Sequence, residues 1–434
     1  MDRMAFLLNM YMSGIKNIED EIKIEFYGKN VNKNFSVDKN NIKGIYGENG
    51  SGKTAIITAV NIVREFIYNP NYLRESQNGI LLRELINKNK REFSFKCEFV
   101  THIELFLIIE YEVCFSFDNN DEIYVSYESL KYKANNSKNK QKVFFVCKDG
   151  DFVELELEDD LKKEAVEKTR NLLYKQSALY PLFLALGKKT DNNEVAWLIL
   201  SSAIFFLVVR VYFDREDRHT DYFYKKRINE LKDGLSSDEL VNELIKGIPT
   251  NARKVPINEF QNYENKIRRL ETFIKLFKPD LKSIDIETKE DRDYYECELL
   301  MNYGSYRVNR EFESTGIKKI IELFDAFEQA SNGQIVFIDE MDSNINDVYL
   351  CKLIEYFTYY GEGQLCFTSH NTNPMSILKE NNKSIDFITR NNGIVPWVKN
   401  GHYTPENSYK NGMIEGMPYN IDSSDFINVF ERGE

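Results

Sequence analysis

The spacing of apolar and polar residues predicts a strand-rich region at the start of the chain. From about residue 4 to residue 132, runs rich in Ile, Val, Phe and Tyr alternate with polar positions, and turn signals such as DNND separate them. A helical stretch from about residue 52 to residue 68 interrupts these runs. We therefore expect several β-strands with one helix between them.

The spacing becomes helical in the middle of the chain. A Lys/Asn/Ser-rich run at 133–142 predicts a surface hairpin or a linker, and a helical period follows from about residue 158. We interpret 158–255 as a helical insertion, with a role in oligomerisation or partner binding. It would separate an N-terminal part, 1–157, from a C-terminal part, 256–434, of one α/β domain.

After Pro256 the pattern predicts one amphipathic helix and then alternating helices and strands. The helix is predicted to end at Pro279. Its apolar positions recur at spacings of three and four, at Phe260, Tyr263, Ile267, Leu270, Ile274 and Phe277. Strand character returns at 283–288 and 294–304, and alternation continues to about residue 398. Such alternation is typical of a mostly parallel α/β sheet.

Two apolar segments raise the question of a membrane. The opening segment is charge-balanced at its front and lacks a cleavage site, so we interpret it as a first strand. In the segment from Val195 to Phe213, the uncharged run from Val195 to Val209 has 15 residues, and a spanning helix needs roughly 20. We expect a helix buried in a core or a subunit interface, no membrane association and a cytoplasmic protein.

Composition narrows the class of function. The chain has 434 residues and a formal net charge of −12, which argues against gripping duplex DNA over a broad basic face but leaves a local basic groove open. Six cysteines without a C-x-x-C pair are typical of buried thiols in a reducing cytosol. With four histidines and no close cysteine pair, structural zinc is not expected.

The segment GENGSGKT, residues 47–54, matches the P-loop pattern G-x-x-x-x-G-K-[ST]. A strand-like IKGIY precedes it and the predicted helix follows, so successive N–H groups would form a positive cradle for phosphates. Lys53 would reach the β- and γ-phosphates, and the Thr54 hydroxyl would bind Mg²⁺. The alternative is a glycine-rich turn that matches by chance. The predicted phosphate-binding residues are Asn49, Gly50, Ser51, Gly52, Lys53 and Thr54.

An acidic pair ends a second apolar run. In QIVFIDEMD the run Ile335–Ile338 predicts a buried strand that delivers Asp339 and Glu340 at its C-terminal end. Asp339 would hold the magnesium ion, and Glu340 would orient or deprotonate the attacking water. Apolar strands often end in acidic residues, so the P-loop is what makes this pair informative.

Two further elements have both a functional and an ordinary interpretation. His370 follows the apolar strand in GQLCFTSHN, where it could contact the γ-phosphate or could be a solvated loop residue. Ser314 and Gly316 open a helix with apolar positions at Ile317 and Ile320. They could bind a phosphate, or Ser314 could simply cap the helix.

These four elements, in this order, resemble the ATP-binding-cassette superfamily. More closely, the chain is similar to the ABC-type ATPases of phage-defence and abortive-infection systems, among them the ATPase domain of overcoming-lysogenization-defect nucleases and the AriA ATPase subunit of the PARIS system. The resemblance covers the P-loop, the β-rich segment after it, Glu313–Gly316, the acidic pair and His370. The C-terminal YKNGMIEGMP, residues 409–418, also resembles that group's terminal motif.

The resemblance implies an ABC-type ATPase head of the SMC/RecF kind, in which a mixed sheet carries the P-loop beside an antiparallel β subdomain. It also implies ATP and Mg²⁺ as cofactors, with ATP sandwiched between two heads. Ser314 and Gly316 would then act on the nucleotide of another copy, and Asp342–Asn346 would cross between subunits. The expected assembly is a dimer or a multiple of it, such as a hexamer.

The signature ESTGIKK departs from the transporter form L-S-G-G-Q, which disfavours a transporter subunit. No magnesium-sensing glutamine stands out beyond the candidate Gln77, and no adenine-stacking aromatic can be selected.

Three functions stay open. The first is an anti-phage ATPase that hydrolyses ATP and controls a separate toxic effector, such as a TOPRIM-type nuclease, on a phage trigger. The second is a RecF/SMC-like DNA-repair or DNA-sensing ATPase. The third is a GTPase, which would require an N-K-x-D guanine motif; the nearest segment, NKSID at 382–386, has one residue too many.

Overall fold

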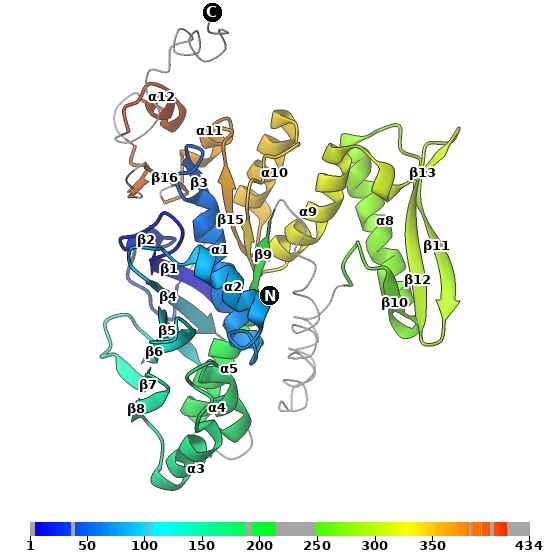
Figure 1. Ribbon diagram of the computed structural model, residues 1–434. Helices are drawn as coiled ribbons and strands as arrows, with labels where there is room; N and C mark the ends of the chain where they lie inside the picture. Colours follow the sequence, from blue (N-terminus) through cyan, green and yellow to red (C-terminus); the bar gives the residue numbers. More distant parts are fainter. Residues whose placement is uncertain are drawn as a thin grey trace, which may run out of the picture.

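The computed structural model describes residues 5–35, 40–102, 105–186, 193–213, 248–381, 383–389, 391, 393–399 and 403–414. Two large sheets and a smaller β-lobe organise these residues (Figure 1). The helical pattern at 222–248 lies almost wholly outside the described residues, as do residues 415–418 of the C-terminal motif and residue 382 of the candidate guanine motif.

The first sheet is antiparallel and has seven strands in the order β2-β1-β4-β5-β6-β7-β8. Alternation of buried and exposed positions along β4 shows why these residues form strands with one face on a core. The strands are β1 (Ala5–Ser13), β2 (Ile22–Glu25), β4 (Glu92–His102), β5 (Phe106–Phe117), β6 (Ile123–Ala134), β7 (Lys142–Lys148) and β8 (Asp151–Leu155). The predicted β-rich N-terminal region and its first strand are confirmed.

The second sheet has six strands in the order β17-β16-β3-β15-β14-β9 and is parallel except for β17. Its strands are β3 (Ile42–Gly47), β9 (Val209–Tyr212), β14 (Ile335–Ile338), β15 (Gln364–Ser369), β16 (Ile385–Ile388) and β17 (Ile394–Pro396). Strands β3, β14 and β15 are buried along their whole length. The loops after these three strands therefore meet at one edge of the sheet, where ligands of parallel α/β sheets bind.

The two faces of this central sheet belong to two hydrophobic cores. On β14, Ile335 and Phe337 join the core shared with the antiparallel sheet, whereas Val336 and Ile338 join the core on the other face. This alternation follows from the two-residue period of a strand. The helix α1 (Lys53–Tyr68) lies in the first core and is buried on most of its surface.

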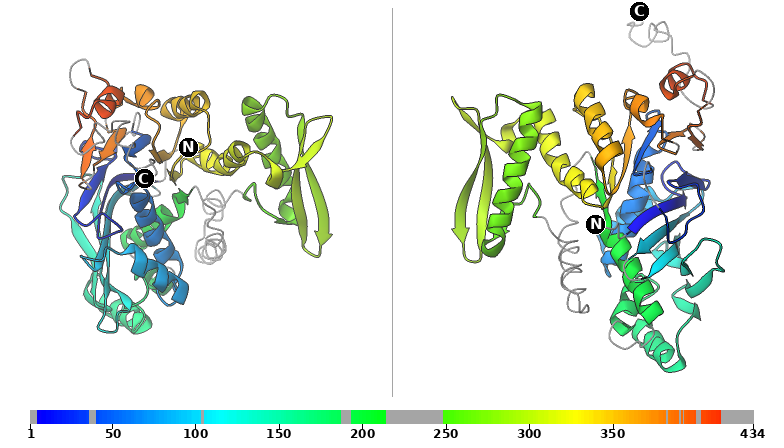
Figure 2. Two further views of the ribbon diagram at one scale, coloured as in Figure 1. Left: turned by 45° about the horizontal axis from the view of Figure 1, so that its top comes forward. Right: turned by 180° about the vertical axis from the view of Figure 1, so that it is seen from behind.

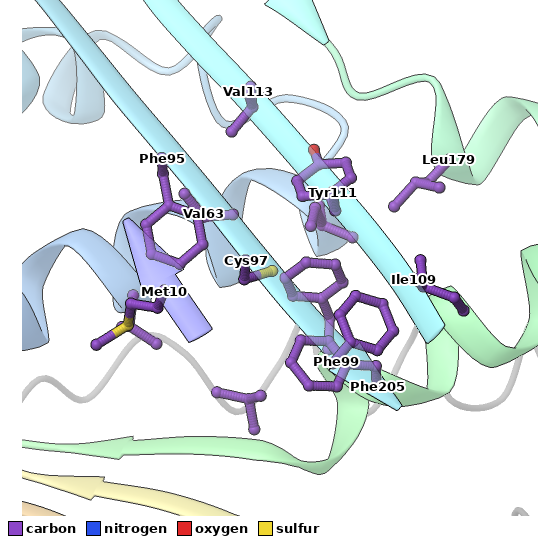
Figure 3. Packing of buried hydrophobic residues seen from close by; sticks show 14 of the residues in the cluster. Met10, Val63, Phe95, Cys97, Phe99, Ile109, Tyr111, Val113, Leu179 and Phe205 are labelled. Carbon is purple, nitrogen blue, oxygen red and sulfur yellow. The ribbon is translucent and has the colours of Figure 1, made fainter. Parts of the chain in front are cut away.

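The first core is rich in aromatic rings (Figure 3). Phe99 of β4 stacks on Phe205 with ring centroids 3.7 Å apart, and Cys97, Met10 and Val63 lie around the pair. The helices α3 (Asp159–Thr169), α4 (Leu179–Leu186) and α5 (Asn193–Val208) cover the far end of this core. They lie within the predicted insertion 158–255, whose boundaries stay a prediction.

The apolar segment Val195–Phe213 is only partly a helix, which corrects the expectation of one buried helix. Helix α5 ends at Val208, and Val209–Tyr212 forms β9, the edge strand that pairs in parallel with β14. Two branched valines favour a strand there, and the strand extends the central sheet. None of the helices in the described ranges combines the length and the apolar character that crossing a membrane requires.

A smaller lobe carries the helix that follows the Glu313–Gly316 segment (Figures 1 and 2). In it, α8 (Phe260–Phe277) packs beside β10 (Lys254–Pro256), β11 (Ser283–Asp291), β12 (Tyr294–Asn302) and β13 (Arg307–Asn309), and α9 (Thr315–Ser331) joins the lobe to the central sheet. Short 3₁₀ turns at Ile257–Glu259 and Arg310–Phe312 connect these elements. The amphipathic helix predicted before Pro279 is confirmed as α8.

The remaining helices are α2 (Ser76–Leu85), α10 (Asp347–Tyr360), α11 (Met375–Leu378) and α12 (Pro405–Lys410). The sequence pattern missed α2, because only Leu82 of this helix is buried and its apolar period is weak. Gln77, the candidate magnesium-sensing glutamine, lies exposed in the first turn of α2. The predicted fold class is confirmed: a mixed α/β fold with the P-loop sheet beside an antiparallel sheet.

Candidate nucleotide site

The loop between β3 and α1 has the shape that the P-loop motif requires. Gly50 and Gly52 have φ angles of 79° and 112°, in the left-handed region that glycine adopts without a steric penalty. At Gly47 a Cβ would lie 2.6 Å from both Ile388 Cγ2 and Ser51 Oγ, so no side chain fits. The glycines therefore allow the backbone to turn tightly into the start of α1.

Polar groups around this loop fit an anionic ligand. Gly52 is the N-cap of α1, and no side chain caps the helix, so the N–H groups and the helix dipole of the first turn are available to a phosphate. Ser51 Oγ is buried and has no hydrogen-bond partner among the described residues. A buried hydroxyl without a partner is rare in a folded protein and is consistent with a ligand-binding role.

Lys53 lies across the loop. Its Nζ donates to the carbonyl oxygens of Gly47 and Glu48, each at 2.8 Å, and the side chain is buried. Burial lowers the pKa of Lys53 to about 8, although the nearby carboxylates of Asp339 and Glu340 oppose this shift. The ammonium group is therefore mostly protonated at pH 7 and close to the acidic pair.

Thr368 fixes both members of that acidic pair. Its hydroxyl donates to Asp339 Oδ1 at 2.6 Å and accepts from the backbone N–H of Glu340 at 2.8 Å. Asp339 is buried at the C-terminal end of β14, whereas Glu340 is half-buried with a φ of 47°. A non-glycine residue in this left-handed region is uncommon, and such strained residues cluster at active sites.

The donor set at this edge fits a magnesium ion that arrives with a nucleotide. Thr54 is half-buried in the first turn of α1, next to Lys53, and Asp339 offers a second oxygen ligand. Within the ranges that the structure describes, no group of three or more His, Cys, Asp or Glu side chains could hold a metal ion by itself. Mg²⁺ is usually held by one or two protein groups together with phosphate oxygens and water, so Thr54 and Asp339 suffice.

His370 lies at the same edge, directly after β15. Desolvation and the ammonium of Lys53 lower the pKa of His370, while the carboxylates of Asp342, Glu340 and Asp339 oppose the shift. The imidazole is therefore mainly neutral at pH 7. The backbone N–H of His370 donates to Asp342 Oδ2 at 3.2 Å, which ties this residue to the loop after the acidic pair.

Ser314 and Gly316 lie elsewhere, at the N-terminus of α9. Ser314 is the N-cap, and its hydroxyl accepts from the N–H of Ile317 at 3.5 Å, so the capping interpretation is confirmed. Among the described residues, neither Ser314 nor Gly316 has a hydrogen bond to the P-loop. The structure thus gathers Lys53, Asp339, Glu340 and His370 at one edge and leaves the signature apart.

Sequence reasoning missed two basic or polar residues of the first tight turn. Lys16 is half-buried, and burial lowers its pKa while Asp339 opposes the shift, so its ammonium is near the same edge. Asn17 Nδ2 donates to Gly50 O at 2.8 Å and so supports the P-loop. The signal was the GIKN turn directly after the first strand, which the search for nucleotide motifs did not include.

Comparison with known proteins places this site in a family. Residues 42–376 match the family described as "AAA domain, putative AbiEii toxin, Type IV TA system". This match spans the P-loop, the acidic pair and His370. No curated protein matches the chain.

Several solved structures are similar to this one. The SmcHead bound to the C-winged helix domain of ScpA has 13% identity and a TM-score of 0.45, with 90% of this chain and 97% of that chain covered. The SMC head domain from Thermotoga maritima has 13% identity and a TM-score of 0.33, with 91% and 99% covered. The recombination mediator protein RecF-ATP in the RecFOR pathway has 14% identity and a TM-score of 0.39, with 91% and 98% covered.

Proposed function

This chain belongs to the AAA-domain family that is described with the AbiEii toxin of Type IV TA systems, and from that membership we propose that it binds and hydrolyses ATP as the ATPase subunit of an anti-phage, abortive-infection type defence system. In this proposal two heads pair on ATP and hold a separate toxic effector, such as a TOPRIM-type nuclease. A phage trigger then releases or activates the effector.

One observation carries the ATPase part of the proposal. The C-terminal ends of the adjacent parallel strands β3, β15 and β14 lie at one edge of the sheet. A buried lysine, an acidic pair and a histidine therefore lie close together beside the P-loop. Lys53 is close enough to the carboxylates of Asp339 and Glu340 that each affects its pKa. A cation, a metal-binding carboxylate and a second carboxylate are the parts that phosphoryl transfer to water needs.

Each residue has a separate task in the proposed reaction. Lys53 leaves the carbonyl oxygens of Gly47 and Glu48 and binds the β- and γ-phosphates. Thr54 and Asp339 would hold Mg²⁺, which neutralises phosphate charge when bound. Glu340 accepts a proton as the water oxygen bonds to the γ-phosphorus, and the bond to the bridging oxygen breaks to leave ADP and phosphate.

The position of the signature supports pairing of heads. Ser314 and Gly316 are separate from the P-loop of their own chain, so they would close over the nucleotide of a second copy. Phe312, two residues before Ser314, is 83% exposed. A second copy that closed over Ser314 would also cover this aromatic side chain, as aromatic residues are enriched in protein interfaces.

Replacing Glu340 by Gln tests the catalytic assignment. The amide cannot accept the proton of the attacking water, so we expect hydrolysis to fall about 10²- to 10⁴-fold while ATP binding persists. Size-exclusion chromatography with light scattering should then show an ATP-dependent assembly that the wild-type protein forms only transiently. Hydrolysis at the wild-type rate in this variant would overturn the assignment of Glu340.

Two further measurements test the biological part. Co-purification with the product of the neighbouring gene should recover the effector, and growth of cells that express the chain alone should be unaffected. Toxicity of the chain alone would instead make this protein the toxin.

Hydrolysis should be insensitive to duplex DNA. Strong stimulation that disappears as salt rises would favour the DNA-sensing alternative.

A further inference from the structure

Two carboxylates bind the loop that carries His370, Asp342 from the loop before α10 and Asp347 from the first turn of that helix. Asp342 Oδ2 accepts from the backbone N–H groups of His370 and Asn371, at 3.2 and 3.0 Å. Asp347 accepts from the side-chain amides of Asn371 and Asn373, at 2.6 and 2.7 Å. Four hydrogen bonds thus join the loop after the acidic pair to the loop after β15.

The two elements also have hydrogen bonds of their own. The N-terminus of α10 is already capped by Asn346, whose side chain accepts from the N–H of Val348 at 3.0 Å. The loop after β15 already has internal bonds, from Asn371 N–H to Ser369 Oγ and from Asn373 N–H to Asn371 Oδ1, both at 2.9 Å. The two carboxylates therefore add a connection between elements.

Asp342 also pays an energetic cost in this position. Its Oδ1 is buried and accepts no hydrogen bond from the described residues. A buried carboxylate oxygen without a donor destabilises the fold, so stability alone does not explain an aspartate here. A polar atom in this position is consistent with a donor supplied from outside the chain, such as a water molecule or a ligand.

The same loop contacts the signature. A Cβ on Gly316 would lie 2.9 Å from the carbonyl oxygen of Asn344, so the start of α9 packs directly on the loop 342–346. The loop also bears the bond from Asp342 to the His370 backbone. A continuous set of contacts therefore runs from Gly316 through Asn344 and Asp342 to His370.

We infer that Asp342 and Asp347 are positioning residues that align His370 with the γ-phosphate and couple this alignment to the loop 342–346 and the signature. The inference rests on the proposed function, because it assigns His370 to the ATP site. When a second copy places its nucleotide on Ser314 and Gly316, the contact through Asn344 holds the loop, and the two carboxylates hold the histidine. Hydrolysis in one copy thus depends on what occupies its own signature.

The test is a set of double-mutant cycles on ATP hydrolysis by the full-length protein. Asp347→Asn keeps the side-chain shape but replaces one of two accepting oxygens by a donor. Asp342→Ala removes the single oxygen that accepts both backbone N–H groups, because an asparagine there could keep both bonds through its amide oxygen. We expect kcat to fall about 10- to 100-fold, with KM for ATP changed less than about twofold. Combined with His370→Ala, either substitution should cause no further loss, because both act through the same residue.

A matched control and a second variant keep the test decisive. Glu355→Gln removes a carboxylate from the same helix that pairs with Lys352 at 2.6 Å, and it should leave kcat unchanged. Asn373→Ala breaks only the outer bond to Asp347 and gives a milder change if Asp342→Ala fails to fold. Thermal unfolding of each variant shows whether the fold is intact.

Several outcomes would overturn the inference. Losses that add to that of His370→Ala would show that the carboxylates do not act through the histidine, as would a change confined to KM. An unchanged kcat in His370→Ala would remove the residue on which they act. Absence of ATP hydrolysis by the wild-type protein would instead defeat the proposed function itself, and that result is distinct from the others.

Discussion

The N-termini of α1 and α9 both contain glycine and serine, but they differ in backbone conformation, capping and burial. At the start of α1, the N-cap is Gly52 in a left-handed conformation, no side chain caps the helix, and Lys53 is buried beside it. At the start of α9, Ser314 has an extended backbone, caps the helix with its own hydroxyl and is exposed. The first leaves its N–H groups uncapped beside a buried cation, as the proposed phosphate site requires, whereas the second is capped by an exposed serine.

This difference teaches which half of a shared site each helix supplies. An enclosed loop with a buried cation can bind a nucleotide within one chain. An exposed N-terminus with its first donors partly satisfied contributes little binding by itself and suits a surface that closes on a nucleotide already bound. Binding should therefore depend on the first helix, and pairing on the second.

The largest effect is expected from Lys53→Ala. Removing the ammonium should weaken ATP binding about 10²- to 10³-fold, because no other group of the loop supplies a buried positive charge to the phosphates. Isothermal titration calorimetry on the purified protein measures this change in ATP affinity. Lys318→Ala is the matched control at the other helix, where the exposed ammonium donates to Glu311 O at 3.4 Å. Equal losses in both variants would contradict the comparison.

A smaller effect is expected from Ser314→Ala. Loss of the cap should destabilise α9 by about 1 kcal/mol. ATP affinity of the single chain should be unchanged, while ATP-dependent assembly and hydrolysis should fall about tenfold or more. Calorimetry and light scattering together separate the two quantities. A loss of ATP affinity as large as that of Lys53→Ala would show that both helices serve one nucleotide within a chain.

The smallest effect is expected from pH. Burial lowers the pKa of Lys53 from 10.5 to about 8, so the ammonium of the free protein loses its proton as pH rises through about 8. A bound triphosphate favours the charged form, and ATP affinity should therefore fall between pH 7.5 and 9, by about five- to tenfold.

The same pKa shift affects the stability of the fold in the opposite direction: the free energy of unfolding rises with pH, whereas ATP affinity falls. The unfolded lysine keeps its proton up to its ordinary pKa, so the penalty of burying a charged Lys53 is present below pH 8 and disappears as pH rises toward 10.5. In Lys53→Arg the guanidinium stays charged over this range, and the pH dependence of ATP affinity should vanish. A steep pH dependence that persists in this variant would assign the titration to another group.

Much of the nucleotide site was predictable because its signals are local. The glycine spacing at 47–52 predicts a tight turn with positive φ angles. The apolar runs predict buried strands, and Asp339 and His370 directly follow the ends of two of them. Parallel strands in neighbouring positions then bring these ends to one edge. The capping role of Ser314 was also open to prediction from a single turn of helix.

Other features were hidden because their cause lies far away in the chain. Val209–Tyr212 looks like the end of an apolar helix until β14 pairs with it, and Thr368 looks like an ordinary strand residue until Asp339 and Glu340 lie beside it. Lys16 lies more than 300 residues from Asp339 and approaches it only in the folded protein. The helix and strand propensities of single residues carry no information about contacts between distant parts of the chain.

By itself, the sequence determined the glycine turn, the buried strands and which polar residues follow the ends of those strands, since each depends on a few adjacent residues. Only the tertiary structure decided that Thr368 bonds both members of the acidic pair, that Asp342 and Asp347 bind the histidine loop, and that the start of α9 packs on the loop 342–346. The physical reason is that hydrogen bonds and charge interactions depend on distances between atoms, and those distances are set by how the sheets and helices pack.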